Sequence, residues 1–294
     1  VDYFTDEAGR LVQTEATRRG ESQPYRVEYR EYDDRGYLSR VEYEDDGVVT
    51  RIDAFQNDAD GNKIKRWHDN DGDGSWDYIE GYEFDTRGNI TKQSQDHNAD
   101  GVYDAIYHYF FDADGKPVGR EDDGDADGTP NSRWTFVYNA DGLMEREDYD
   151  DDANGTIDRA LRYTYDANGN RLSTASDGNN DGDFTDVNEW VQTYTYDADN
   201  LQKTQLTVMT GNDTSYVAYD HDSNGNMVRE RRDNDYDGVA PHWDAKTTYA
   251  YDDHNRLVSL SEDSDFDGTV DYEYTCDYDD FGNVVASTHF SGGI

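Results

Sequence analysis

The chain has 294 residues, of which 33% are hydrophobic and 32% are charged, and its formal net charge is −42. This acidity disfavours binding to nucleic acids and to anionic membrane surfaces, because both carry negative charge themselves. The single cysteine, Cys276, excludes an intramolecular disulfide, and the sequence contains no apolar run long enough to insert into a membrane.

An aromatic motif recurs along the chain from its first residues onward. It reads aromatic-x-aromatic-Asp-x-x-Gly followed by an aliphatic residue, as in Tyr82–Ile90 and Tyr163–Leu172. Aromatic residues at every second position predict a strand with one buried face. The Asp-x-x-Gly step predicts a turn, in which Asp bonds the backbone and Gly supplies a positive φ. A shorter and more polar second strand is expected next, as in Ile90–Ser94, so each repeat predicts one strand pair.

The segment Tyr163–Leu172, Tyr-x-Tyr-Asp-x-x-Gly-x-x-Leu, resembles the YD repeat of RHS proteins, and copies of it extend over nearly the whole chain. RHS proteins are long extracellular or secreted bacterial proteins. The resemblance implies antiparallel hairpins that coil into a continuous sheet, which in some members closes around a toxin. This sequence departs from the family pattern in one respect, because an acidic loop stands where a short turn is usual.

The acidic loop separates successive strand pairs. It reads Asp-x-Asp-x-Asp-Gly-x-x-Asp from Asp69 to Asp77, and related loops begin at 96, 123, 150 and 177, which is every 27 residues. Two further loops begin at Asp233 and Asp263. A fixed period of this length predicts an array of repeats. Because the clustered carboxylates repel one another, the pattern predicts a hard cation among them.

Two classes of calcium loop are similar to this motif. An EF-hand loop needs an acidic residue at position 12, which Glu80 and Asp244 provide for two loops only. The better match is the calcium-bearing hairpin loop of integrin-type propellers, in which an Asp at position 9 completes the site. Calcium accepts six to eight oxygen ligands, whereas magnesium demands stricter geometry and zinc prefers Cys and His. The sequence therefore predicts about seven Ca²⁺ ions.

The predicted ligands are the side chains at loop positions 1, 3, 5 and 9 and the backbone carbonyl at position 7, with additional acidic residues in the irregular loops. They are Asp69, Asp71, Asp73, Ser75 and Asp77; Asp96, Asn98, Asp100, Val102 and Asp104; Asp123, Asp125, Asp127, Thr129 and Asn131; Asp150, Asp152, Asn154, Thr156 and Asp158; Asp177, Asn179, Asp181, Asp183 and Asp186; Asp233, Asp235, Asp237, Val239 and Asp244; Asp263, Asp265, Asp267, Thr269 and Asp271. Metal binding by segments 42–53 and 220–228 is left open.

These patterns predict an all-β protein in which tandem 27-residue, two-strand repeats form an elongated or spiralling antiparallel sheet. Residues 1–294 are expected to be one array of about eleven repeats and a fragment of a longer chain. A parallel β-solenoid is the alternative, but its rungs would place cations only about 4.8 Å apart. We expect the aromatic rows to form the core and Cys276 to be a buried thiol.

The expected function is structural. Regular repetition without a unique polar constellation predicts no enzyme activity and favours a calcium-rigidified extracellular or cell-surface protein, such as an adhesin stalk, a spacer or a filament subunit. Its partners would be a second copy, arranged head to tail, or further repeats of the same chain. One alternative is a shell segment of an RHS-type toxin. Another is a carbohydrate- or surface-binding module that uses exposed aromatic residues such as Trp76 or Trp190.

Overall fold

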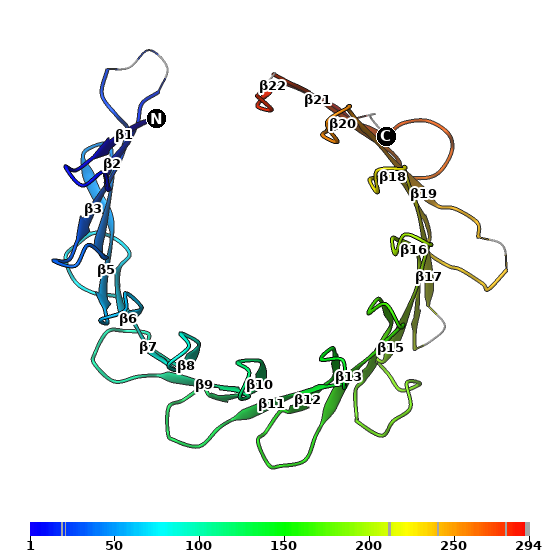
Figure 1. Ribbon diagram of the computed structural model, residues 1–294, viewed down its shortest axis with the longest axis horizontal. Coiled ribbons are helices and arrows are strands. Elements are labelled where there is room, and N and C mark those ends of the chain that lie inside the picture. Colours follow the sequence, from blue (N-terminus) through cyan, green and yellow to red (C-terminus); the bar gives the residue numbers. More distant parts are fainter. Residues whose placement is uncertain (19, 21, 211–212, 240, 280, 292–294) are drawn as a thin grey trace. The chain divides into compact units, whose positions relative to one another are not determined.

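The computed structural model describes residues 1–18, 20, 22–210, 213–239, 241–279 and 281–291. These residues form 22 strands and no helix (Figure 1). A search of the same residues for a long apolar helix of membrane-spanning type found none. Two compact units can be distinguished, one comprising Val1–Phe136 and Tyr149–Thr156, the other Val137–Asp148 and Ile157–Ile294.

The first unit contains ten complete strands, and each one pairs antiparallel with the next along the chain. They are β1 (Asp2–Thr5), β2 (Leu11–Ala16), β3 (Arg26–Tyr32), β4 (Leu38–Asp45), β5 (Val48–Asn57), β6 (Lys63–Asp69), β7 (Tyr78–Phe84), β8 (Ile90–Asp96), β9 (Ala105–Phe111) and β10 (Pro117–Asp123). The division between the units falls within β11 (Ser132–Tyr138) and β12 (Met144–Asp150).

The second unit contains the remaining ten complete strands, again paired antiparallel in chain order. They are β13 (Arg159–Tyr165), β14 (Arg171–Asp177), β15 (Trp190–Tyr196), β16 (Gln202–Met209), β17 (Thr214–His221), β18 (Met227–Asp233), β19 (Ala245–Tyr251), β20 (Leu257–Asp263), β21 (Tyr272–Tyr278) and β22 (Val284–Ser291). The pairing confirms the predicted antiparallel all-β class, and the parallel β-solenoid is wrong.

The predicted Asp-x-x-Gly turn is confirmed, and carboxylate-to-backbone bonds hold it. Oδ1 of Asp85 accepts the N–H of Arg87 at 2.8 Å and that of Asn89 at 2.9 Å. Gly88 has a φ of 87°, which an L-residue rarely adopts. The register of β7 and β8 shifts by one residue between Glu83 and Phe84. The turn therefore fixes both the reversal of the chain and the pairing of the two strands.

The second strand of each hairpin is longer than the sequence predicted. β8 continues past Ser94 to Asp96, and its seven residues equal the length of β7. Asp96 pairs with Ile79, so the first acidic residue of the loop is still part of the ladder. Polar residues are tolerated in this strand because backbone pairing holds it, and only one side of an antiparallel strand needs apolar cover.

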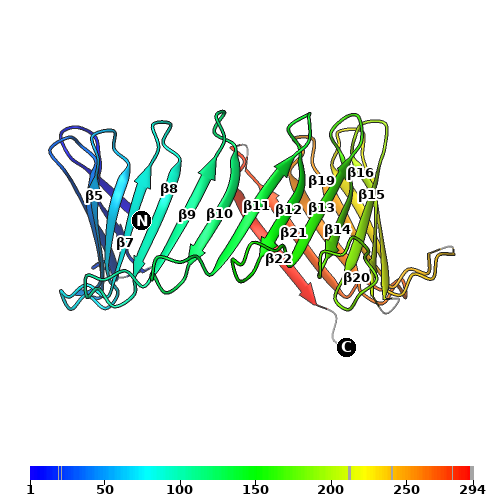
Figure 2. The ribbon, with the colours of Figure 1, turned by 90° about the horizontal axis from the view of Figure 1, so that it is seen from below.

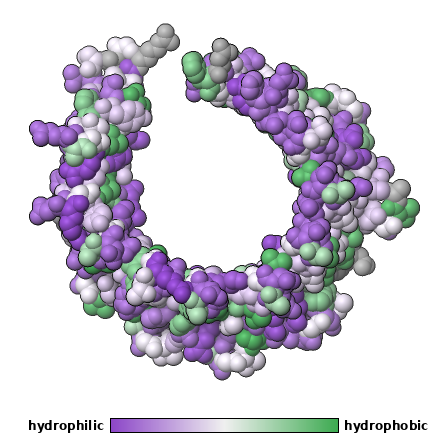
Figure 3. All heavy atoms as spheres, viewed as in Figure 1, coloured by the Kyte–Doolittle hydropathy of each residue, from purple (hydrophilic) through white to green (hydrophobic). Residues whose placement is uncertain are grey.

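Each unit is one layer of strands, and this explains an unexpected core. Ile52, Ile79 and Ala105 are buried, but the largest fully buried side chains among the described residues are acidic: Glu189, Asp53, Asp69, Asp96 and Asp177. The prediction that the aromatic rows form the core is wrong, because no second layer covers rings such as Tyr82 and Phe84, which are half-buried. Burial still raises the pKa of Tyr82 to about 12. Hydrophobic and hydrophilic residues accordingly mix on the surface (Figure 3).

The turn carboxylates predict a specific dependence of stability on pH, illustrated by Asp166. The side-chain N–H of Asn170, at 2.9 Å, and the backbone N–H groups of Asn168 and Asn170 lower the pKa of Asp166 below its usual value. Ionised Asp166 therefore contributes its full stability above about pH 4, the pKa in the unfolded chain, and loses it as the pH falls through the lowered folded-state pKa.

We predict that Asp166→Asn is less stable than the wild type at pH 7 and that this gap in unfolding free energy closes in acid. Urea unfolding of both proteins at several pH values between pH 2 and pH 7 measures this difference in unfolding free energy. Comparing the two proteins at the same pH cancels the contributions of all other titrating groups. Asp199→Asn, an exposed change in the neighbouring turn, is the matched control and should show no such closing gap. A gap that stays constant with pH would contradict the assignment.

Candidate metal-binding loops

The acidic loops connect the second strand of one hairpin to the first strand of the next. Within each unit they lie at one rim, whereas the short turns lie at the opposite rim (Figure 2). Loop positions are numbered from the first Asp, so Asp69 is position 1 and Asp77 is position 9. In the five nine-residue loops, which begin at 69, 96, 123, 150 and 263, position 1 ends a strand and position 9 immediately precedes one, which brings the two together at the neck of the loop.

The side chain at position 1 is buried and collects backbone donors. Asp69 is 0% exposed, its Oδ1 accepts the N–H of Gly72 at 2.7 Å, and its Oδ2 accepts that of Gly74 at 2.8 Å. Burial raises the pKa of Asp69, but these and other backbone N–H groups together hold it below the usual value. The same donor, position 6, reaches Oδ2 of Asp96, Asp123, Asp150, Asp177 and Asp263.

Positions 3 and 5 shape the loop through local bonds. Oδ1 of Asp71 accepts the N–H of Asp73 at 3.2 Å, and Oδ1 of Asp73 accepts that of Ser75 at 2.7 Å. The glycine at position 6 has the positive φ that the sequence predicted, 90° at Gly74. The backbone conformation at position 4 was not predicted from the sequence. This residue also has a positive φ in five loops where it is not glycine: Ala99, Ala126, Ala153, Asn180 and Phe266. Each of the four that are not Asn stores roughly 1–2 kcal/mol of strain.

The residue before the next strand closes the loop. Oδ2 of Asp77 accepts the N–H of Asn70 at 2.7 Å, while the N–H of Asp77 donates to the carbonyl of His68, also at 2.7 Å. The same two bonds close the loops of Asp104, Asn131 and Asp271. Asp244 makes them too, although its loop is three residues longer, because it still directly precedes a strand.

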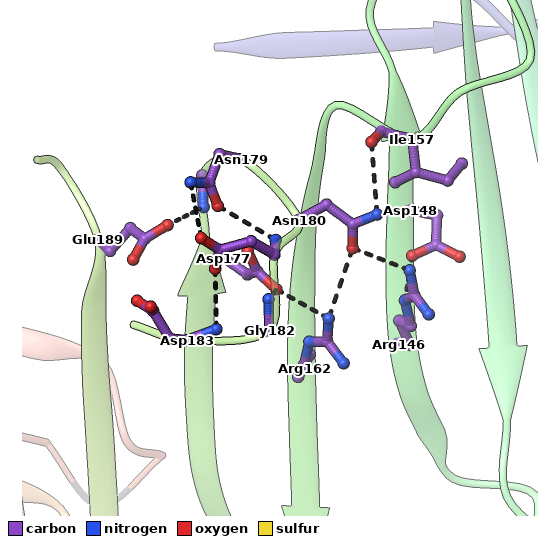
Figure 4. A network of polar contacts seen from close by, with 12 residues as sticks. Arg146, Asp148, Ile157, Arg162, Asp177, Asn179, Asn180, Gly182, Asp183 and Glu189 are labelled. Carbon is purple, nitrogen blue, oxygen red and sulfur yellow. Dashed lines mark hydrogen bonds and ion pairs between the residues drawn. The ribbon is translucent and has the colours of Figure 1, made fainter. Parts of the chain in front are cut away.

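The loop that begins at Asp177 is closed by a residue that the sequence analysis missed. Glu189 is 1% exposed and lies beside the loop (Figure 4). Its Oε1 accepts the N–H of Gly178 at 2.8 Å, and its Oε2 accepts that of Asp186 at 2.9 Å. Its bond to Gly178, at position 2, matches the bond of Asp77 to Asn70, whereas its own N–H donates to the carbonyl of Asp186. An insertion hides this equivalence, and the available signal was its place directly before the strand that begins at Trp190.

The same loop is anchored on a neighbouring hairpin of its unit by Asn180. Its Oδ1 accepts from Arg146 at 3.1 Å, and its Nδ2 donates to the carbonyl of Ile157 at 3.4 Å (Figure 4). Arg162 in turn forms an ion pair with Oδ2 of Asp177 at 2.8 Å. A basic side chain therefore already offsets part of the charge at position 1 of this loop.

Several groups of acidic side chains are close enough to share a cation. Carboxylate oxygens within 4.8 Å of one another occur in the sets Asp69, Asp71 and Asp77; Asp123, Asp125 and Asp127; Asp181, Asp183 and Asp186; and Asp233, Asp235 and Asp244. The sequence had placed Glu80 at position 12 of the first loop, but it lies on β7 beside His68, at 3.4 Å. The predicted ligands of the loop that begins at Asp150 are divided between the two units, because Asp150 to Thr156 belong to the first and Asp158 to the second.

Three of the buried position-1 carboxylates each retain an oxygen without a partner. Oδ1 of Asp177, Asp233 and Asp263 is buried and has no hydrogen-bond partner, whereas Oδ2 of the same side chains accepts from the loop backbone. These three residues are 0%, 2% and 2% exposed. A buried oxygen without a donor is unfavourable by about 1–3 kcal/mol. The loops therefore offer oxygens suited to a metal ion.

No known protein-family model matches the chain, and no curated protein matches it in sequence. The fold is similar to solved structures of Tc toxin components. A TcdB2–TccC3 crystal structure without the hypervariable C-terminal region matches 98% of this chain and 15% of its own chain, with a TM-score of 0.58 and 16% identity. A Photorhabdus luminescens Tc holotoxin pore structure matches 97% and 19% respectively, with a TM-score of 0.38 and 12% identity. The first similarity supports the fold expected from the RHS resemblance.

We predict that Glu189→Ala lowers the free energy of unfolding by about 2 kcal/mol, because two N–H groups lose their shared acceptor. Val187→Ala, two residues away and 83% exposed, should lower it by less than about 0.5 kcal/mol. Urea unfolding with and without added calcium measures both variants. Equal effects of the two substitutions would show that Glu189 does not close the loop.

Proposed function

We propose that this chain is a calcium-stabilised structural repeat protein that works outside the cell or at its surface. The supporting observation is the buried position-1 carboxylate with one oxygen bound to the backbone and the other without a partner, as in Asp177, Asp233 and Asp263. The backbone N–H groups hold one oxygen and so orient the carboxylate, which leaves the other oxygen available to bind a metal ion. Residues at positions 3 and 5, with the carbonyl at position 7, would complete the set.

The donor chemistry favours calcium. The clustered groups are carboxylates, with Asn at a few positions and neither Cys nor His among the predicted ligands, and hard oxygen donors suit calcium. A bound ion would supply charge neutralisation and a fixed hub for the loop. About seven divalent ions would offset about fourteen of the negative charges on the chain. Calcium would then couple the rigidity of each hairpin to conditions outside the cell, where this ion is abundant.

A structural role fits the repetition of one hairpin design along the described chain, and we propose no enzymatic activity. The second candidate is a shell segment of an RHS-type toxin. It is favoured by the similarity in fold to TcdB2–TccC3, of which this chain spans 15% of the length. Head-to-tail association, or pairing with further repeats of the same chain, remains part of the first proposal.

Calcium should raise the thermal stability of the chain, and a chelator should lower it. Each site contributes about 2.7 kcal/mol when calcium is present at 100 times its Kd. Calorimetric titration gives the number of ions bound, and differential scanning calorimetry gives the melting temperature. We predict that Asp71→Asn, which places at loop position 3 the neutral ligand that Asn98 provides in the next loop, weakens calcium binding by the first loop and lowers the stabilisation by calcium accordingly.

Asp60→Asn is the matched control, because it removes the same charge from an exposed turn residue of the same unit. It should leave the calcium affinity of the loops unchanged. A melting temperature that does not respond to calcium or chelator would overturn the proposal. So would equal losses in Asp71→Asn and Asp60→Asn, which would indicate diffuse attraction of ions to an acidic surface.

Loops should differ in calcium affinity according to the basic residues that face them. Arg162 competes with a cation for Asp177, so Arg162→Met should increase the calcium affinity of that loop severalfold. Arg171→Met, an exposed change on β14 of the same unit, is the control for lost positive charge. Calorimetric titration of both variants measures the change. Unaltered affinity in Arg162→Met would mean that the ion pair does not compete with calcium.

A further inference from the structure

A cavity on the sheet of the first unit is lined by more basic than acidic residues, although the chain as a whole is strongly acidic. It has a volume of about 540 Å³, within the usual range for small-molecule sites, and side chains from β3 to β8 line it. Four lining residues are basic (Arg30, Arg51, Lys63 and Arg66), and two are acidic (Glu28 and Asp53). The whole chain has 26 basic and 68 acidic residues, so the ratio is reversed here.

Asp53 is the internal anchor of the cavity. It is 2% exposed and accepts from Arg51 Nη2 at 2.8 Å and from Arg66 Nη2 at 3.3 Å. The ring Nδ1 of His68 lies 2.8 Å from the same carboxylate. Glu28 pairs with Arg30 at 2.5 Å. The two lining carboxylates are therefore shared among three arginines, and Glu80, beside the cavity, lies a further 3.8 Å from Arg66. These carboxylates hold the guanidinium groups in place, and the charge of Lys63 is left without an acidic partner among the described residues.

One basic side chain at the cavity, Lys63, is not paired with a carboxylate among the described residues. Its Nζ lies 4.2 Å from the centre of the Phe55 ring. The Nε atoms of Arg51 and Arg66 are buried without a hydrogen-bond acceptor. A buried donor without a partner is unfavourable, and guanidinium groups bind carboxylates in particular. The unpaired charge of Lys63, beside three arginine side chains, favours an anionic ligand.

The remaining wall is apolar and aromatic. Tyr82, Phe84 and Ile90 line it, and Tyr82 is buried enough for its pKa to rise to about 12. Such a wall suits the flat apolar face of a ring rather than a bare inorganic ion, because pockets of this kind orient a ligand by a few polar groups and bind it through apolar contact. We propose that this cavity binds a small ring-bearing carboxylate, of which a hexuronic acid is representative.

The test is calorimetric titration of the calcium-loaded chain with sodium glucuronate, glucose and sodium acetate. Glucose has the ring without the carboxylate, and acetate has the carboxylate without the ring. We expect saturable binding of one glucuronate, with glucose and acetate at least about tenfold weaker. Absence of glucuronate binding, or equal binding of glucose or acetate, would overturn the proposal.

Two lysines on β6 provide a matched pair of variants. Lys63 is exposed and lines the cavity, whereas Lys65 does not line it. Lys63→Gln should weaken glucuronate binding about tenfold, and Lys65→Gln should leave it unchanged. Both changes remove one positive charge from the same strand, so equal effects would show general charge attraction and overturn the assignment. Circular dichroism of both variants verifies that the fold is retained.

Discussion

Bonds from carboxylates to backbone N–H groups hold together both kinds of connection in this chain. In the short turn, one oxygen of Asp85 accepts two N–H groups, and in the acidic loop Asp69 accepts three. A single layer of strands buries too little apolar surface to fix its own register, because each face stays partly in water. Register is therefore set at the rims, where each turn determines which residues of two strands face each other.

This solution concentrates negative charge at the rim that carries the acidic loops. The carboxylates at positions 3 and 5 bond only to N–H groups of their own loop and remain exposed, so they repel one another. The strained φ at Ala99, Ala126 and their equivalents shows that the loop holds a conformation that its sequence alone disfavours. Such strain persists where surrounding contacts over-determine the backbone, and a cation shared by the carboxylates would supply that constraint in the proposed function.

The sequence predicts local features of this fold well because they depend on neighbouring residues. The 27-residue period, the turn at Asp85 and the positive φ of Gly74 all follow from short patterns. Features that depend on packing were missed. The half-burial of Tyr82 follows from the absence of a second layer, and the closing role of Glu189 follows from an insertion that moved the acid away from position 9. The basic cavity joins residues from six strands, which no local pattern reveals.

The repeats are alike in sequence yet differ in the charge around position 1. Only backbone N–H groups contact Asp69 and Asp96 in the bonds described above, whereas Arg162 pairs with Asp177 and Lys246 lies 3.6 Å from Asp263. A cation that entered these last two loops would have to compete with a resident positive charge. Loops without a basic neighbour would therefore fill first as calcium rises. A repeat array of this kind would stiffen in steps over a range of calcium concentrations, rather than at one threshold.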